Sequence, residues 1–227
     1  MFPRPSFFRG AKLNFAENLL YPPQAPDPDS PAVLAATETG RETVTWAELR
    51  ERVRLCQSGM VAYGVQAGDR VAGFVANHTN ALVAMLAATS LGAIWTAVSP
   101  DTGVTAVLDR MAQIEPVVLL CDNAVMYNGK VHPTLAKVGE IAASLPSLRA
   151  IVIFQTVTSV GTELASTTLT AKTYTYESFC AKSDGTARLE FTQLPPDHPV
   201  YILYSSGTTG APKCKSLRFL HNLIPKH

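Results

Sequence analysis

The sequence has almost no excess of charge of either sign and little charge in total. It carries 19 Lys and Arg against 18 Asp and Glu, and charged residues make up 16% of its 227 residues. A balanced surface argues against nucleic acid or an anionic membrane as a partner, because both require a basic face. A soluble domain averages roughly 25% charged residues. We therefore expect a large buried fraction and an ordered chain rather than disorder.

Cysteine is also scarce, and the four cysteines are widely separated, at Cys56, Cys121, Cys180 and Cys214. No C-x-x-C spacing occurs, which excludes a zinc knuckle or a local redox motif. We expect reduced thiols, with Cys56 and Cys121 in the core. The N-terminus is basic and faintly like a transit peptide, but it lacks the apolar run of a secretory signal. A cytoplasmic location is therefore the prediction.

Several catalytic motifs are missing. There is no G-x-S-x-G elbow, no G-x-G-x-x-G fingerprint and no pair of histidines spaced as in H-E-x-x-H. These absences argue against a hydrolase triad, a dinucleotide site and a helical zinc site. We assign no catalytic or metal-binding residue from sequence. His78 follows an expected strand end, where it either caps or packs a helix or lines the ligand side of a sheet.

One uncharged run, residues 81–99, reaches the length of a membrane-spanning helix. Within it, Leu91 and Gly92 are typical of a helix C-terminus, since glycine adopts left-handed backbone angles without penalty. The residues that follow, AIWTAV, are rich in strand formers. The run therefore predicts a buried helix followed by a buried strand, and no membrane partner.

Strands and helices are expected to alternate after a hairpin formed by 32–36 and 42–44. Expected strands cover 71–75, 93–98, 117–121, 150–154 and 200–204. Expected helices cover 46–63, 80–91, 104–114, 133–145 and 176–182, with caps at Thr45, at Thr79 or Asn80, and at Asp101 or Thr102. Residues 156–173, rich in Ser and Thr, are expected to form a loop. Strands that are apolar throughout predict a doubly wound α/β fold with about five parallel strands.

The segment after the last expected strand carries the clearest chemistry. It reads SSGTTGAPK, and its candidate binding residues are Ser205, Ser206, Gly207, Thr208, Thr209, Gly210 and Lys213. Hydroxyls and backbone amides after a buried strand can form an anion-binding nest, and the lysine can neutralise a phosphate. The segment is not a Walker A loop, because proline stands at 212 and cysteine at 214. A flexible linker is the alternative.

This segment, with Tyr204 before it, resembles the phosphate-binding signature of the acyl-adenylating superfamily. Residues 7–20 and 84–101 resemble acetate- and acetoacetate-activating synthetases, while GVTAVLDRMAQIEPVVLL and YNGKVH resemble acetoacetyl-CoA synthetases in particular. The resemblance divides the chain into an extended N-terminal segment (1–31), a partial AMP-binding N-terminal domain (32–213) and a divergent tail (214–227). It stops near Cys214, which suggests a truncated ligase.

The resemblance implies a two-step ligase that uses ATP with Mg²⁺, acetoacetate and coenzyme A. Its phosphate loop would hold the β- and γ-phosphates, with Thr208 and Thr209 as the best direct contacts. Lys130 lies near where related acetate enzymes contact coenzyme A phosphates; a solvated turn lysine is the alternative. We expect the chain alone to be inactive. Two alternatives are a non-catalytic protein that binds nucleotide or the full-length enzyme, and a ligase for acetate or another short acid.

Overall fold

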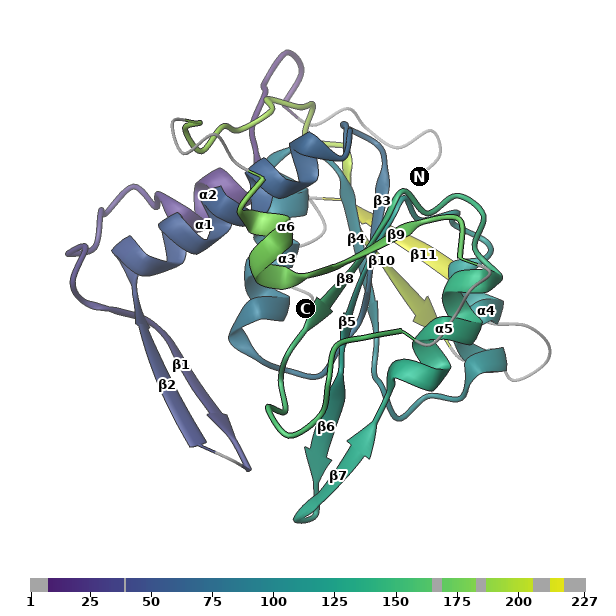
Figure 1. Cartoon of the computed structure of the whole chain (residues 1–227). Helices are drawn as coiled ribbons and strands as arrows, with labels where there is room; N and C mark the ends of the chain where they lie inside the picture. The colour runs from purple at the N-terminus through teal and green to yellow at the C-terminus, as the bar shows by residue number, and fades with distance from the viewer. Residues whose placement is uncertain (1–7, 39, 165–168, 183–186, 206–212, 219–227) are drawn as a thin grey trace.

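A seven-stranded sheet forms the centre of the molecule (Figure 1). The computed structural model describes residues 8–38, 40–164, 169–182, 187–205 and 213–218. In spatial order the strands are β11 (Lys213–Arg218), β10 (Pro199–Ser205), β4 (Ile94–Val98), β3 (Arg70–Phe74), β5 (Val118–Asp122), β8 (Ala150–Phe154) and β9 (Lys172–Thr175). Six strands are parallel, while β11 runs antiparallel to β10.

Helices cover both faces of this sheet, as expected for a doubly wound α/β fold. One face packs against α1 (Phe15–Leu20), α2 (Trp46–Ala62), α3 (Thr79–Ser90) and α6 (Tyr176–Cys180), and the other against α4 (Val104–Met111) and α5 (Leu135–Ala143). Alternate strand residues supply the two cores: Val71 faces the first set, whereas Ala72 and Phe74 face the second. Burial on both sides explains why these strands are apolar throughout.

Two hairpins extend from the sheet region. One pairs β1 (Pro31–Thr37) with β2 (Gly40–Thr45), as the sequence predicts, and the other pairs β6 (Ala124–Tyr127) with β7 (Lys130–Pro133), which it did not predict. Figure 1 shows both hairpins on the same side of the molecule.

The helix ends test the expected caps. Thr45 accepts from the Glu48 amide at 3.2 Å, and the Glu48 carboxylate accepts from the Thr45 amide at 2.8 Å, which confirms the capping box. The expectation of Thr79 or Asn80 at the start of α3 is wrong: His78 is the cap, its Nδ1 accepting from the Ala81 amide at 3.3 Å. The ring occupies the place that a hydroxyl or amide usually takes.

The start of α4 also differs from expectation. Neither Asp101 nor Thr102 is its cap; Gly103 occupies that position and makes no side-chain cap bond. The backbone of Gly103 is extended, at φ −70° and ψ 151°, so the helix begins two residues later than an Asp101 cap would allow. The expected helix is nevertheless present.

The long uncharged run folds as a helix and a strand. α3 ends at Ser90, Gly92 takes a φ of +76°, and β4 follows. This confirms the left-handed glycine that separates the two elements. In the part of the chain that the structure describes, no helix is both long and apolar enough to cross a membrane.

Three elements lie where the sequence suggested loops or divergence. β9 occupies the end of the expected 156–173 loop, and β11 occupies the start of the expected tail. Within the N-terminal segment, α1 forms a short helix whose cap, Asn14, accepts from the Glu17 amide at 3.1 Å. All three elements are short, and β9 and β11 are polar edge strands, so they lack the apolar pattern on which sequence prediction depends.

Candidate functional site

The candidate site lies at the carboxyl ends of the parallel strands. The chain passes from β3 to β4 on one side and later to β5 on the other, so the strand order reverses at β3. Open α/β sheets bind ligands in the crevice outside such a reversal. Here the crevice is formed by the loops that follow β3, β5 and β8.

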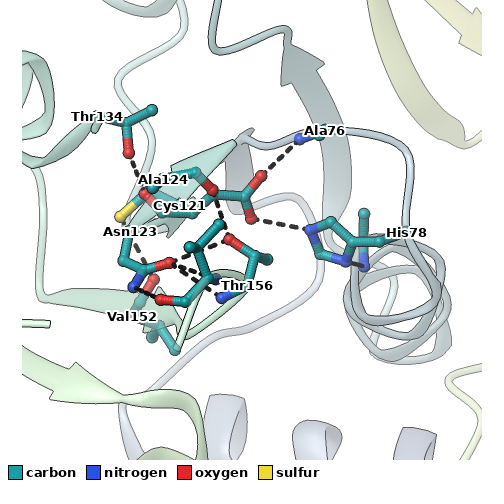
Figure 2. A network of polar contacts seen from close by, with 11 residues as sticks. Ala76, His78, Cys121, Asn123, Ala124, Thr134, Val152 and Thr156 are labelled. Atoms are coloured by element: carbon teal, nitrogen blue, oxygen red, sulfur yellow. Dashed lines mark hydrogen bonds and ion pairs between the residues drawn. The ribbon is translucent and has the colours of Figure 1, made fainter. Parts of the chain in front are cut away.

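Asp122, the last residue of β5, is fully buried at this point. Its two carboxylate oxygens accept from His78 Nε2 and from the Ala76 amide, both at 2.8 Å (Figure 2). His78 Nδ1 already accepts from an α3 amide, so the hydrogen must lie on Nε2 to serve Asp122. One carboxylate thus joins the ends of β3 and β5 to the start of α3. His78 caps its helix, as one sequence interpretation held.

Asn123, also fully buried, fixes the loop after β8. Its Oδ1 accepts from the Thr156 amide and hydroxyl, each at 3.0 Å, and from the Val157 amide at 3.1 Å. Its Nδ2 donates to the carbonyls of Val157 at 2.9 Å and Val160 at 2.8 Å. A single amide side chain therefore holds a loop more than thirty residues away in sequence (Figure 2).

A cavity of about 320 Å³ with a mixed polar and apolar lining lies beside this network. Its titratable lining residues are Glu38, Glu42, Arg52, His78 and Asp122. Glu42 accepts from the Thr79 hydroxyl and pairs with Arg52 at 2.7 Å. The Thr79 hydrogen bond, more than Arg52, lowers the pKa of Glu42.

The two hairpins meet at the rim of the cavity. The turn between β6 and β7 has Asn128 and Gly129 at positive φ, and their amides donate to the Glu38 carboxylate at 2.8 and 3.0 Å. These bonds, that of Gly129 first, lower the pKa of Glu38. Lys130 follows at the start of β7 and is exposed.

The predicted phosphate segment is only partly described. Ser205 ends β10 and lies opposite Lys213, the first residue of β11. Ser206, Gly207, Thr208, Thr209 and Gly210 lie outside the described residues. Because β10 is parallel to β4, the end of β10 belongs to the same sheet edge as Asp122. Contacts between the candidate binding residues and a nucleotide stay a prediction.

Sequence reasoning missed Asp122 and Asn123. The available signal was an Asp-Asn pair directly after a fully apolar strand, at the edge where α/β folds place ligands. In the described ranges, no group of three or more His, Cys, Asp or Glu residues comes close enough to hold a metal ion. We therefore assign no Mg²⁺ ligand among the residues that the structure describes.

Known proteins resemble this chain over most of its length. The chain is 60% identical over 218 residues to a malonamoyl-CoA synthetase of Penicillium aethiopicum, and 45% identical over 214 residues to the acetoacetyl-CoA synthetase of Gallus gallus. The alignments cover 94% and 92% of this chain but 30% and 31% of those proteins. The chain thus spans about a third of the length of its curated relatives.

A solved structure agrees in fold. The acetoacetyl-CoA synthetase of Streptomyces lividans superposes with a TM-score of 0.78 at 39% identity, covering 92% of this chain and 30% of that one. The sequence profile of the AMP-binding enzymes matches residues 23–223, which include the sheet, the Asp122 network and the phosphate segment. With nearly the whole chain matched, it belongs to the AMP-binding enzyme family.

Proposed function

We propose that this chain supplies the phosphate-binding part of an ATP-dependent ligase that joins a short 3-oxo acid to coenzyme A. The observation that carries the proposal is the segment Tyr204–Lys213, whose flanks pair at the carboxyl edge of a sheet shared with acetoacetyl-CoA synthetase. Nucleotide phosphates bind at this edge in α/β folds. The residues proposed to bind the phosphates are those that the family resemblance implies: Ser205, Ser206, Gly207, Thr208, Thr209, Gly210 and Lys213.

In the reaction, a carboxylate oxygen of the acid attacks the α-phosphorus of ATP, and pyrophosphate leaves. The thiol of coenzyme A then attacks the acyl carbon, and AMP leaves. The phosphate segment contributes to the first step: its amides and hydroxyls stabilise the charge that grows on the departing pyrophosphate. Thr208 and Thr209 are the proposed direct contacts, with Lys213 as charge partner. Lys130, exposed at the β6–β7 turn, is a candidate for the coenzyme A phosphates.

The proposed acid is acetoacetate, with malonamate as the second candidate. The avian and bacterial relatives are named for acetoacetate, whereas the fungal relative with 60% identity is named for malonamate. The two acids have the same skeleton, a carbonyl group separated from the carboxylate by one methylene, and differ in a methyl or an amino group. The amide group of malonamate forms hydrogen bonds that the methyl group of acetoacetate does not. A polar or an apolar acyl pocket therefore distinguishes the two acids.

This chain alone is expected to show no adenylation, because it spans only about 30% of the relatives. A phosphate segment by itself binds nucleotide weakly, since exposed charges are screened by water and salt. We place the protein in the cytoplasm and propose small molecules, rather than nucleic acid or a membrane, as its partners.

The proposal is tested with a hybrid in which residues 8–213 replace the matching third of the Streptomyces lividans enzyme. We expect the hybrid to return labelled pyrophosphate to ATP when acetoacetate is added, and the same assay with malonamate ranks the two acids. Thr208→Ala and Thr209→Ala should each reduce exchange about 100- to 1,000-fold, as the loss of a transition-state hydrogen bond does. The matched control, Thr170→Ala, lies in the loop before β9 and should leave exchange unchanged.

A folded hybrid without exchange, or Thr208 and Thr209 variants as active as the control, would contradict the assignment. A chain that catalyses exchange by itself would contradict the expectation that it is inactive alone. A transcript read across the codons for 213–227 shows whether the reading frame continues past His227.

A further inference from the structure

The turn between β6 and β7 carries a dipeptide with its own covalent chemistry. Asn128 is the only asparagine in the sequence that a glycine follows. Tyr127 pairs with Lys130, so Asn128 and Gly129 form a two-residue turn, and they take the positive φ that such turns require, +51° and +70°. Both residues are exposed, and no atom beyond the adjoining residues lies within 4 Å of where a Cβ on Gly129 would be. The asparagine is therefore followed by a residue without steric cover.

One contact restrains this turn. The Glu38 carboxylate accepts from the Asn128 amide at 2.8 Å and from the Gly129 amide at 3.0 Å. Glu38 stands 90 residues before Asn128, so the contact exists only in the folded chain. The backbone nitrogen of Gly129 thus keeps its proton directed at a negatively charged acceptor.

We propose that Asn128 is a deamidation site and that Glu38 protects it. In deamidation, the backbone nitrogen of Gly129 attacks Cγ of Asn128. A C–N bond forms, the Cγ–Nδ2 bond breaks, and ammonia leaves with the proton that the backbone nitrogen loses. Water then opens the cyclic imide at either carbonyl, which leaves aspartate or isoaspartate at position 128. No electrons are transferred, and water is the only co-reactant.

Glu38 opposes the first of these steps in two ways. The Gly129 nitrogen must lose its proton to attack, and the hydrogen bond to the carboxylate holds that proton in place. Negative charge develops on this nitrogen and then on Oδ1 of Asn128, and a neighbouring carboxylate raises the energy of both states. The pKa of Glu38 is lowered by the amides of Gly129 and Asn128, so its carboxylate is too weak a base to remove the proton itself.

The product would change the rim of the cavity. Aspartate at position 128 adds a second negative charge to the turn that binds Glu38, and like charges repel. Isoaspartate adds one carbon to the backbone between the two amides that Glu38 accepts from, so they no longer converge on one carboxylate. Deamidation should therefore release the β6–β7 turn from the β1–β2 hairpin.

The experiment incubates the whole 227-residue chain in mildly alkaline buffer, folded and in urea. Peptide mapping measures conversion at each asparagine, with aspartate and isoaspartate separated. Asn128 should convert about 10-fold faster in urea, where the fold no longer brings Glu38 to the turn. Asn77 is the internal reference, because it is exposed but precedes His78, whose side chain hinders the same attack. In urea, Asn128 should convert faster than Asn77.

Three variants test the role of Glu38. Glu38→Ala removes both hydrogen bonds and should accelerate conversion of Asn128 about 3- to 10-fold in the folded chain, as the loss of one or two exposed hydrogen bonds does. Glu140→Ala removes an exposed carboxylate from α5 and should leave the rate unchanged. Asn128→Asp reproduces one product, and hydrogen exchange at the Gly129 amide should accelerate severalfold.

The comparison with urea decides the proposal even if a variant fails to fold. Equal rates at Asn128 in the folded chain and in urea would overturn it. A Glu38→Ala chain that converts no faster than the unaltered chain would overturn the protective role, and a slower one would make the carboxylate the base. Conversion of Asn77 as fast as Asn128 in urea would show that Asn128 is not a preferred site.

Discussion

The carboxyl edge of the sheet is built differently at two of its strand junctions. Where β3 meets β5, the buried side chains of Asp122 and Asn123 tie three loops together through a dense hydrogen-bond network. Where β4 meets β10, the described residues pair at Trp95 and Tyr201, and Thr96 adds one side-chain bond. The first junction is fixed by its own polar core, and the second is much more sparsely joined.

The strand at the sparse junction is positioned mainly by the segment before it. The Leu13 and Leu194 backbones form a bridge, Asn14 donates to the Thr192 carbonyl at 2.9 Å, and His198 Nε2 contacts the Gly92 carbonyl oxygen at 2.8 Å. β10 is therefore positioned by contacts that the segment before it makes with the start of α1 and with the end of α3. This difference predicts that core substitutions near β5 cost global stability, whereas those near β10 act locally.

The largest effect is expected at Asn123. Asn123→Ala should lower the free energy of unfolding by about 3 kcal/mol or more, because each buried group left unpaired costs about 1–3 kcal/mol. Urea denaturation measures it. Gln155→Ala, at an exposed neighbour in the same loop, should stay within about 0.5 kcal/mol of the unaltered chain. A loss below about 1 kcal/mol at Asn123 would mean that the loop is held by other contacts.

His78→Asn separates the cap from the carboxylate contact. Asparagine is a favoured cap and should keep the start of α3, but it cannot reproduce the Nε2 bond to Asp122. A buried carboxylate that loses one of its two partners should cost about 1–3 kcal/mol. Thermal and urea unfolding measure the loss, with Asn77→Ser at the exposed preceding residue as control. Unchanged stability would show that water serves Asp122 equally well.

A substitution at Gly92 tests how closely the segment before β10 packs against the end of α3. Gly92→Ala should cost about 2–3 kcal/mol, since alanine is strained at φ +76° and its Cβ would lie 2.5 Å from the Leu194 side chain. Gly68→Ala is the matched control, because Gly68 has φ +87° with open space around it, and should cost only the backbone strain of about 1 kcal/mol. Equal losses in urea would show that Leu194 yields freely and does not position β10.

Thr96 tests the sparse junction itself. Thr96→Val keeps the shape but removes the hydroxyl that donates to the Ile202 carbonyl at 3.0 Å, at a cost of about 1 kcal/mol. Amide exchange should accelerate in β10 and β11 and stay unchanged in β3, β5 and β8. Uniform acceleration across the sheet would contradict the local behaviour proposed for this junction.

The buried architecture could be predicted from sequence, because apolar strands and a capping box are local signals. Thr45 and Glu48 stand three residues apart in sequence. Gly92 separates a segment with helix-forming residues from one with strand-forming residues. The edge strands β9 and β11 could not be predicted, since KTYT and KCKSLR lack apolar alternation. Their pairing depends on a neighbouring strand distant in sequence.

The candidate site divides in the same way. The phosphate segment could be proposed because hydroxyls, glycines and a lysine gather in one short run; Thr208 and Thr209 lie outside the described residues, and their role stays a prediction. Asp122 and Asn123 were missed because their partners, His78 and Thr156, are brought to them only by the fold. A polar pair after an apolar strand indicates that a hydrogen-bond network is present there. It does not indicate which residues form the other half of each bond.

The smallest effect is expected where the two hairpins meet, at Glu38. The amides of Gly129 and Asn128 lower its pKa, so its contribution to stability is present above the ordinary glutamate pKa and is lost as pH falls through the lower folded value. Exchange of these two amides should therefore accelerate, relative to the sheet, as the solution is acidified from about pH 6 to about pH 3. Glu38→Gln should remove that dependence, because glutamine offers an acceptor oxygen without charge. Glu140→Gln, at an exposed site on α5, should leave it intact; a pH response that survives in Glu38→Gln would place its origin elsewhere.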